Sequence, residues 1–257
     1  MIFENVALVY KENKRNISEN IKQEYLSFSN TTLINISEIT RASISNKDLI
    51  ITLGGDGTFV ESANRIDTSM ILGVNSDPKT SEGALTSFDI TELHMLEDIL
   101  EGNFNIIERQ RADVWLNNNL LGEHSTNDIY IGAEYAFHSS RYIISYNGQT
   151  EEHRSSGVII STGTGSAAWF KSAGGEEFSY TEKKLRFIVR EPYIGKRIFM
   201  PTILKGEIHS DEKIRFESTR DYGGVLSIGF KNYDFNRGDI AEIKVSDKPL
   251  KVLERKI

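Results

Sequence analysis

The sequence of 257 residues contains no cysteine. Disulfide bonds, thiolate catalysis and cysteine-ligated zinc are therefore excluded. It also has no apolar run long enough to span a bilayer, and its N-terminus lacks the basic segment that opens a signal peptide. We therefore expect a cytoplasmic protein without a membrane partner.

The chain also has no excess of basic residues. The chain has 30 Lys and Arg against 37 Asp and Glu, which gives a formal net charge of −7. Proteins that bind nucleic acids are usually basic, so no nucleic-acid partner is expected. A phosphorylated small ligand stays compatible, because a local cradle can oppose the overall charge. The five histidines show no metal-ligand spacing.

Strand and helix signals alternate over the first hundred residues. Apolar runs predict buried strands at residues 6–10, 49–53 and 70–74. Apolar side chains at helical spacing predict helices at residues 17–28, 58–65 and 90–101. This alternation predicts a parallel sheet with helices on both faces. Residues 30–46, rich in Ser, Thr and Asn, allow no assignment.

Strand signals dominate the remainder of the chain. Short apolar runs occur at residues 104–107, 113–116, 128–131, 142–146, 158–162, 185–189, 213–216 and 225–228. Asn147-Gly148 is typical of a hairpin turn. One helix interrupts the strands near residues 166–172. We therefore expect an α/β N-terminal domain with a parallel sheet, residues 1–102, and an all-β antiparallel sandwich, residues 103–257.

The most informative motif is Gly54-Gly55-Asp56-Gly57-Thr58, between a predicted strand and a predicted helix. Such a turn makes a phosphate cradle, because glycines permit φ > 0 and a helix start offers N–H groups and a positive dipole end. The Asp56 carboxylate would repel phosphate unless it accepts a proton from an attacking hydroxyl or helps to hold a metal. Alternatively, Asp56 only caps the helix or forms an Asx turn.

A second turn of small residues follows the strand predicted at residues 158–162. It offers the hydroxyl groups of Thr162, Thr164 and Ser166, and a helix start behind them. Alone, this pattern fits an ordinary turn with a serine N-cap. Two such turns, one in each expected domain, favour a phosphate-rich ligand, or two ligands, held in a cleft between the domains.

Two weaker signals accompany the turns. Residues 73–78 follow a strand, where open α/β sheets carry ligand loops, but alone they fit a plain Asx-Pro turn. Asn127-Asp128 places an amide beside a carboxylate, a pair that can recognise ribose hydroxyls or an adenine edge.

Together these motifs resemble the NAD kinase family, over residues 48–240. Residues 54–58 match its first motif, Asn127-Asp128 stands where the family has Asn-Glu, and residues 157–166 are similar to its Gly-x-x-x-Ser-Thr-Pro-Thr-Gly-Ser. Further features are similar to the branch typified by the mitochondrial NAD kinase of animals: residues 73–78 and 81–83, Ser155-Ser156-Gly157, Gly163 in place of proline, and residues 190–192 and 197–199.

The resemblance implies transfer of the γ-phosphoryl group of ATP to the 2′-hydroxyl of the adenosine ribose of NAD, with Asp56 as the base. It implies phosphate- and ATP-binding residues Gly54, Gly55, Gly57, Thr58, Thr162, Thr164, Gly165 and Ser166. It implies NAD-binding residues Asp56, Gly57, Asn75, Asn127, Asp128, Arg154, Ser156, Ala167, Ala168, Trp169 and Ser172. Mg²⁺ is expected on the ATP phosphates, with no dedicated protein ligands.

The resemblance also implies a homodimer or homotetramer, in which the Arg154 side chain can reach across a subunit interface. Three positions depart from the common pattern: Ser156 replaces Asp, Ala167 replaces Thr and Asp128 replaces Glu. The first two remove groups that could bind a ligand. Two alternatives stay open: a kinase for a lipid or another small alcohol, and a catalytically impaired NAD(P)-binding regulator.

Overall fold

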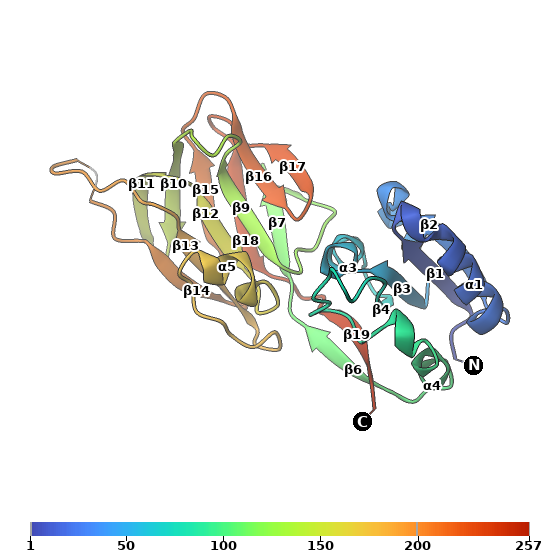
Figure 1. The fold of residues 1–257 in the computed structure, drawn as a ribbon. Helices are drawn as coiled ribbons and strands as arrows, with labels where there is room; N and C mark the ends of the chain where they lie inside the picture. The colour runs from blue at the N-terminus through green and yellow to red at the C-terminus, as the bar shows by residue number, and fades with distance from the viewer. Residues whose placement is uncertain (1, 199, 257) are drawn as a thin grey trace. The chain divides into compact units, whose positions relative to one another are not determined.

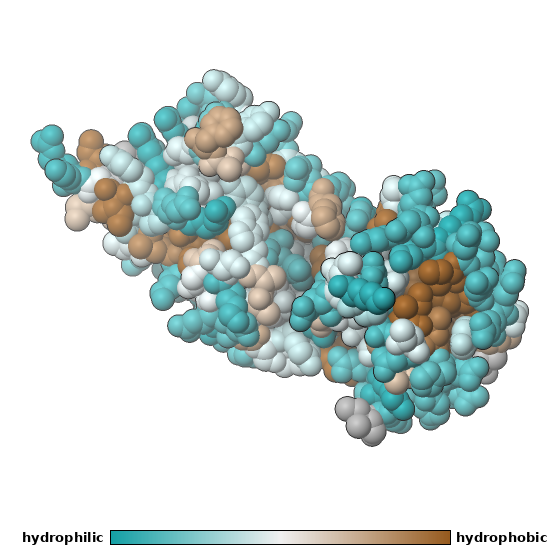
Figure 2. All heavy atoms as spheres, in the orientation of Figure 1, coloured by the Kyte–Doolittle hydropathy of each residue, from teal (hydrophilic) through white to brown (hydrophobic). Residues whose placement is uncertain are grey.

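Figure 1 shows the fold in a computed structural model, which describes residues 2–198 and 200–256. The chain forms two compact units. The first contains the residues up to Glu108 together with those from Leu250 onward, and the second is Arg109–Pro249. The face drawn in Figure 2 is mainly hydrophilic, with separate apolar groups on each unit. None of the described helices is long and apolar enough to cross a membrane.

The first unit is built around a sheet with the order β2-β1-β3-β4-β19-β6, and β5 lies beside β4. Its strands are β1 (Asn5–Tyr10), β2 (Asn30–Asn35), β3 (Leu49–Gly54), β4 (Met70–Asn75), β5 (Phe88–Asp89), β6 (Phe104–Arg109) and β19 (Leu250–Arg255). The pairs β1–β2, β1–β3, β3–β4, β4–β5 and β4–β19 are parallel. The three strands predicted in this region are therefore β1, β3 and β4.

Helices cover both faces of this sheet. They are α1 (Arg15–Tyr25), α2 (Arg41–Ile44), α3 (Asp56–Ala63) and α4 (Met95–Leu100), with 3₁₀ turns η1 (Glu12–Lys14), η2 (Ile36–Glu38) and η3 (Ile90–Glu92). Because side chains alternate along a strand, Leu49 and Ile51 pack in the apolar cluster with α1 and α4, whereas Ile50 packs in the cluster with α2 and α3. The predicted parallel sheet with flanking helices is confirmed.

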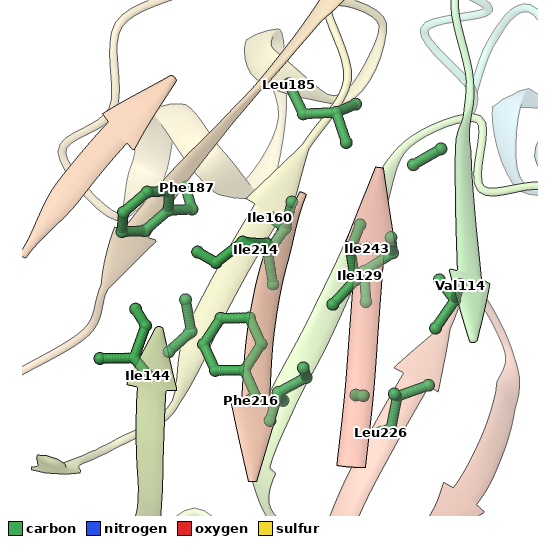
Figure 3. Packing of buried hydrophobic residues seen from close by; sticks show 14 of the residues in the cluster. Val114, Ile129, Ile144, Ile160, Leu185, Phe187, Ile214, Phe216, Leu226 and Ile243 are labelled. Atoms are coloured by element: carbon green, nitrogen blue, oxygen red, sulfur yellow. The ribbon is translucent and has the colours of Figure 1, made fainter. Parts of the chain in front are cut away.

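The second unit consists of two antiparallel sheets, with the orders β11-β10-β15-β18-β7-β8 and β14-β13-β12-β9-β16-β17. The strands are β7 (Ala112–Leu116), β8 (Asn119–Leu120), β9 (Asp128–Ala133), β10 (Ser140–Tyr146), β11 (Gln149–Ser155), β12 (Val158–Ser161), β13 (Lys184–Val189), β14 (Lys205–His209), β15 (Ile214–Ser218), β16 (Gly224–Ile228), β17 (Lys231–Asp234) and β18 (Ile240–Val245). Figure 3 shows Phe216 and Ile243 of one sheet packed in the same apolar core as Ile129 and Ile160 of the other. This confirms the predicted sandwich.

The local turn signals of the second unit also have their expected structures. Asn147 and Gly148 join β10 to β11 with φ angles of 49° and 73°. These positive angles suit a two-residue hairpin turn. The predicted helical interruption consists of η4 (Gly165–Ala167) and α5 (Trp169–Ser172), and α5 lies against β12 (Figure 1).

The division between the units differs from the boundary expected at residue 102. β6 joins the first sheet rather than the sandwich, so the first unit continues to Glu108. The chain also returns at its C-terminal end, where β19 pairs with β4. The placements of β6 and β19 depend on which sheet each strand joins. The apolar pattern of a single strand does not determine that choice.

Candidate active site

The first glycine turn connects β3 directly to α3. Gly55 is the N-cap of α3 with an extended backbone, φ −99° and ψ −167°. A Cβ atom on Gly54 would lie 2.2 Å from Thr58 Oγ1, and one on Gly55 would lie 2.2 Å from Ser81 Oγ. Neither glycine is among those with φ > 0. The turn therefore does not use the positive φ that glycine permits at these two positions, and at Gly54 the Thr58 side chain leaves no room for a Cβ atom.

Asp56 is the first residue of α3 and is half-buried. Its Oδ1 accepts a hydrogen bond from the Leu85 N–H at 2.8 Å, and its Oδ2 accepts one from the Ala84 N–H at 3.2 Å. No side chain caps the start of α3. Asp56 is therefore not a helix cap, and its carboxylate is oriented instead by a loop that lies 28 and 29 residues further along the chain.

That loop, residues 76–87, packs on the glycine turn. The Ser76 N–H donates to the Gly54 carbonyl oxygen at 3.2 Å. Asn75 is buried, with its Nδ2 donating to the Ser81 carbonyl oxygen at 3.0 Å and its Oδ1 accepting from the Asp77 N–H at 3.1 Å. The second bond closes an Asx turn at Asn75. Asn75 thus shapes the loop, and its role in NAD binding stays a prediction.

Most hydroxyl groups of the second turn are used inside the protein. Thr162 Oγ1 donates to the Thr126 carbonyl oxygen at 2.5 Å and accepts from the Gly165 N–H at 3.2 Å. Ser166 Oγ donates to the Gly163 carbonyl oxygen at 2.8 Å. Thr164 Oγ1 is different, since it is buried and has no hydrogen-bond partner among the described residues. Of the three expected hydroxyl donors, Thr164 is thus the one left for a ligand.

Asn127 and Asp128 lie directly against this turn. A Cβ atom on Gly165 would lie 2.7 Å from Asp128 Oδ1 and 2.7 Å from the Asn127 carbonyl carbon, so only glycine fits there. Within the described part of the chain, the side-chain oxygens Asn127 Oδ1 and Asp128 Oδ1 are buried without hydrogen-bond partners, like Thr164 Oγ1. Leaving such atoms unpaired costs about 1–3 kcal/mol each. These three oxygens belong to segments that meet at Gly165, an arrangement that suits a polar ligand.

The electrostatics of this polar site depend on Asp128. Burial raises the pKa of its carboxyl group to about 7, and a hydrogen bond with Ser161 counteracts part of the rise. Perturbed carboxyl groups of this kind are concentrated at functional sites. The site can therefore present either a carboxylate or a neutral acid near neutral pH.

The remaining expected NAD-binding residues lie in the segment of η4 and α5, at Arg154 on β11, and at Ser156 directly after β11. Ala167, Ala168, Trp169 and Ser172 are exposed to solvent. The Trp169 ring centroid lies 5.5 Å from that of Tyr130, on β9. Ser156 donates a short hydrogen bond from its Oγ to Glu191 Oε2.

Tyr130 and Glu191 were not among the expected site residues. Tyr130 follows Asp128 by two positions on β9 and so shares its face, which the sequence could have indicated. Glu191 reaches Ser156 across 35 residues, and no sequence signal marks that contact.

Each set of site residues comes together within its own unit. The first unit brings Gly54, Gly55, Asp56, Thr58 and Asn75 together, and the second unit holds the others. That the two turns meet at one nucleotide stays a prediction. In the described residues, no group of three His, Asp or Glu side chains could hold a metal ion. A cavity of about 320 Å³ between α5 and β13–β14 contains none of the expected site residues.

No family model matches this chain. It is 30% identical over 231 residues to a "Probable NADH kinase" from Oryza sativa subsp. japonica, with 80% of this chain and 70% of the relative covered. It is 25% identical over 232 residues to an "NAD kinase" from Methanosarcina acetivorans, with 88% and 81% covered.

Solved structures show the same fold. A yeast NADH kinase complexed with NADH superposes with a TM-score of 0.76 at 19% identity, covering 98% of this chain and 84% of that one. An NAD kinase from Archaeoglobus fulgidus in complex with ATP gives a TM-score of 0.73 at 20% identity, with 98% and 94% covered.

These relatives define the class of protein as a kinase. The chain belongs to the NAD kinase family, and it is an enzyme that phosphorylates a nicotinamide adenine dinucleotide. The alternatives of a lipid kinase and of a catalytically impaired regulator find no support among these relatives.

Proposed function

We propose that this enzyme transfers the γ-phosphoryl group of ATP to the 2′-hydroxyl of the adenosine ribose of NAD, giving NADP. The observation that carries the proposal is the Asp56 carboxylate, which two backbone N–H groups hold at the start of α3, beside glycines that carry no side chains of their own. Phosphoryl transfer requires such a base together with alignment and charge stabilisation, and little covalent chemistry from the protein.

In the proposed reaction, Asp56 accepts the proton of the ribose 2′-hydroxyl while that oxygen attacks the γ-phosphorus. The bond from the γ-phosphorus to the bridging oxygen breaks, and ADP leaves. Gly54, Gly55, Gly57 and Thr58 would hold phosphate oxygens at the start of α3, where helix N–H groups and the dipole favour negative charge. Thr58 supports this role, because its buried Oγ1 has no hydrogen-bond partner among the described residues.

A divalent cation, Mg²⁺, would be held by the phosphate oxygens of ATP. The donor set fits this arrangement, because Mg²⁺ at kinase sites usually binds substrate phosphates, waters and one or two carboxylates rather than a protein cage. Asp56 is the carboxylate of the glycine turn that could contribute. The cation would neutralise charge on the transferred group.

The adenosine ribose of the acceptor would lie at Asn127 and Asp128, next to Thr164. Their unpaired buried oxygens are suited to ribose hydroxyls and to N–H groups of the base. We propose NAD as the acceptor. The relative from Methanosarcina acetivorans carries the name NAD kinase, whereas the rice relative is described as a probable NADH kinase.

The Asp56→Asn variant tests the catalytic role. It should lower turnover by about 100-fold or more, because a general base contributes that order of acceleration. Asp98→Asn, which makes the same chemical change on α4, serves as the matched control and should keep normal turnover. Near-normal turnover of Asp56→Asn, with both variants folded by circular dichroism, would remove Asp56 from the mechanism.

A cytoplasmic location stays a prediction. We also propose that the protein forms a homodimer or a homotetramer. The support is an apolar segment after β13, where Tyr193, Ile194, Ile198 and Met200 have exposed fractions of 57–84%. The Tyr193 N–H donates to the Arg154 carbonyl oxygen at 2.8 Å, so Arg154 adjoins this segment. Light scattering should show dimers or tetramers for the wild type and monomers for Ile194→Asp with Ile198→Asp. A monomeric wild type contradicts the proposal.

A further inference from the structure

Polar groups lie at both ends of the paired strands β9 and β12 in the second unit. Asp128 at the start of β9 pairs with Ser161 at the end of β12, next to the polar site of Asn127 and Thr164. The opposite end of β12 begins after the turn that contains Ser156 and Gly157. From Thr162 to Gly157 there are five residue steps of about 3.3 Å, so the two ends lie roughly 17 Å apart along the strand. This spacing suits an elongated ligand with a polar group at each end.

Aromatic side chains connect the two ends. Tyr130 lies on the same face of β9 as Asp128, two positions further on. Its ring contacts Trp169 on α5, with 5.5 Å between ring centroids. Its hydroxyl donates to the Ser156 carbonyl oxygen at 3.0 Å. The polar site, Tyr130, Trp169 and Ser156 therefore form one continuous track.

The far end of the track carries two opposite charges, Glu191 and Arg190. Glu191 accepts the hydrogen bond of Ser156 Oγ, and its φ of 47° is uncommon for a residue other than glycine. The Arg190 guanidinium lies 5.2 Å from the centroid of the Trp169 ring. Two backbone bonds fix this end, since the Ser156 N–H donates to the Arg190 carbonyl oxygen at 2.9 Å and the Arg190 N–H donates to that of Gly157 at 2.8 Å.

We infer that Glu191 and Arg190 are specificity-determining residues that set the preference between NAD and NADH. The inference rests on the proposed function, which assigns the adenosine end of the dinucleotide to Asn127 and Asp128 and so leaves the far end of the track for the nicotinamide ring. That ring carries a positive charge in NAD and none in NADH, while the rest of the molecule is the same. The exposed Glu191 carboxylate favours the charged ring, and the Arg190 guanidinium opposes it.

Separate calorimetric titrations with NAD and with NADH test the inference. Glu191→Gln keeps a hydrogen-bond acceptor for Ser156 and should weaken NAD binding relative to NADH binding about fivefold, the effect of losing one exposed charge partner. Arg190→Gln should shift the ratio in the opposite direction. Asp211→Asn removes a negative charge from the exposed turn between β14 and β15 and should leave the ratio unchanged.

An unchanged ratio of NAD to NADH affinity in both Glu191→Gln and Arg190→Gln would overturn the inference. Failure of the wild type to bind either form would also overturn it. Phosphoryl transfer from ATP is measured in parallel. A wild type that binds both forms but yields no product would refute the proposed function, and the binding ratios would still decide the inference.

Discussion

Replacing Asp128 by Asn should make the protein more stable above neutral pH. Burial raises the pKa of this carboxyl group to about 7, from an ordinary value near 4. The folded state therefore binds the proton more tightly than the unfolded state. The stability that this proton contributes is complete below pH 4, declines as the pH rises toward 7, and is absent above it.

The size of the effect follows from the same two pKa values. Their difference means that the free energy of unfolding is about 4 kcal/mol lower when Asp128 is fully ionised than when it is fully protonated. Asn has nearly the shape of Asp and cannot ionise, so Asp128→Asn removes this pH-dependent loss. We expect the free energy of unfolding at pH 8 to rise by about 2–4 kcal/mol, and the difference from the wild type to shrink toward pH 4.

Urea unfolding at several pH values between 4.5 and 8.5, followed by tryptophan fluorescence, measures this difference. Trp115 on β7 and Trp169 on α5 both lie in the second unit. A stability difference that does not change with pH would refute the assignment of a raised pKa to Asp128. The same variant should bind NAD more weakly, because the carboxylate is lost as an acceptor for ribose hydroxyls. A substitution that stabilises the fold and also weakens ligand binding is typical of a position in a ligand site.

Four further substitutions distinguish residues that shape the glycine turns or the β10–β11 hairpin from residues available to a ligand. Gly54→Ala should destabilise the first unit by about 1–3 kcal/mol, measured by urea unfolding, because its Cβ would collide with Thr58. Thr162→Val should destabilise the fold by about 1–3 kcal/mol through the loss of two hydrogen bonds, whereas Thr164→Val should keep full stability and weaken nucleotide binding in calorimetry. Gly148→Ala should lower the unfolding free energy by about 1 kcal/mol and leave turnover unchanged, because φ is 73° there and no atom lies near.

The sequence predicted elements whose signals are local. β1, β3 and β4 read as apolar runs because helices cover both sheet faces, and the Asn147-Gly148 hairpin follows from backbone preferences of the turn residues. β2 escaped prediction because it lies at the edge of its sheet, where Asn30 and Thr32 are exposed and only Thr31 and Ile34 are buried. The helix predicted at residues 90–101 is divided, because Asp89 and Glu92 form a capping box around η3 and α4 begins only at Met95.

The sequence could not reveal the sheet to which a strand belongs. β6 carries the same kind of apolar run as the sandwich strands, yet it extends the sheet of the first unit. β19 pairs with β4 through Val252 and Ile71, across most of the chain. Such pairings are decided by the packing of whole layers. The same limit applies to Glu191, whose contact with Ser156 depends on the course of the chain after β13.

The two glycine turns share a property that the motifs alone do not show. Each turn keeps one threonine hydroxyl that is buried and has no hydrogen-bond partner among the described residues, namely Thr58 in the first and Thr164 in the second. Each unpaired group costs about 1–3 kcal/mol, and a bound oxygen acceptor would recover that energy. Thr162 and Ser166 also carry hydroxyl groups, but these donate hydrogen bonds to backbone carbonyl oxygens. Ligand contacts are therefore better assigned from unpaired buried atoms than from membership of a motif, and on this basis Thr58 and Thr164 are the hydroxyls that should face phosphate or ribose oxygens.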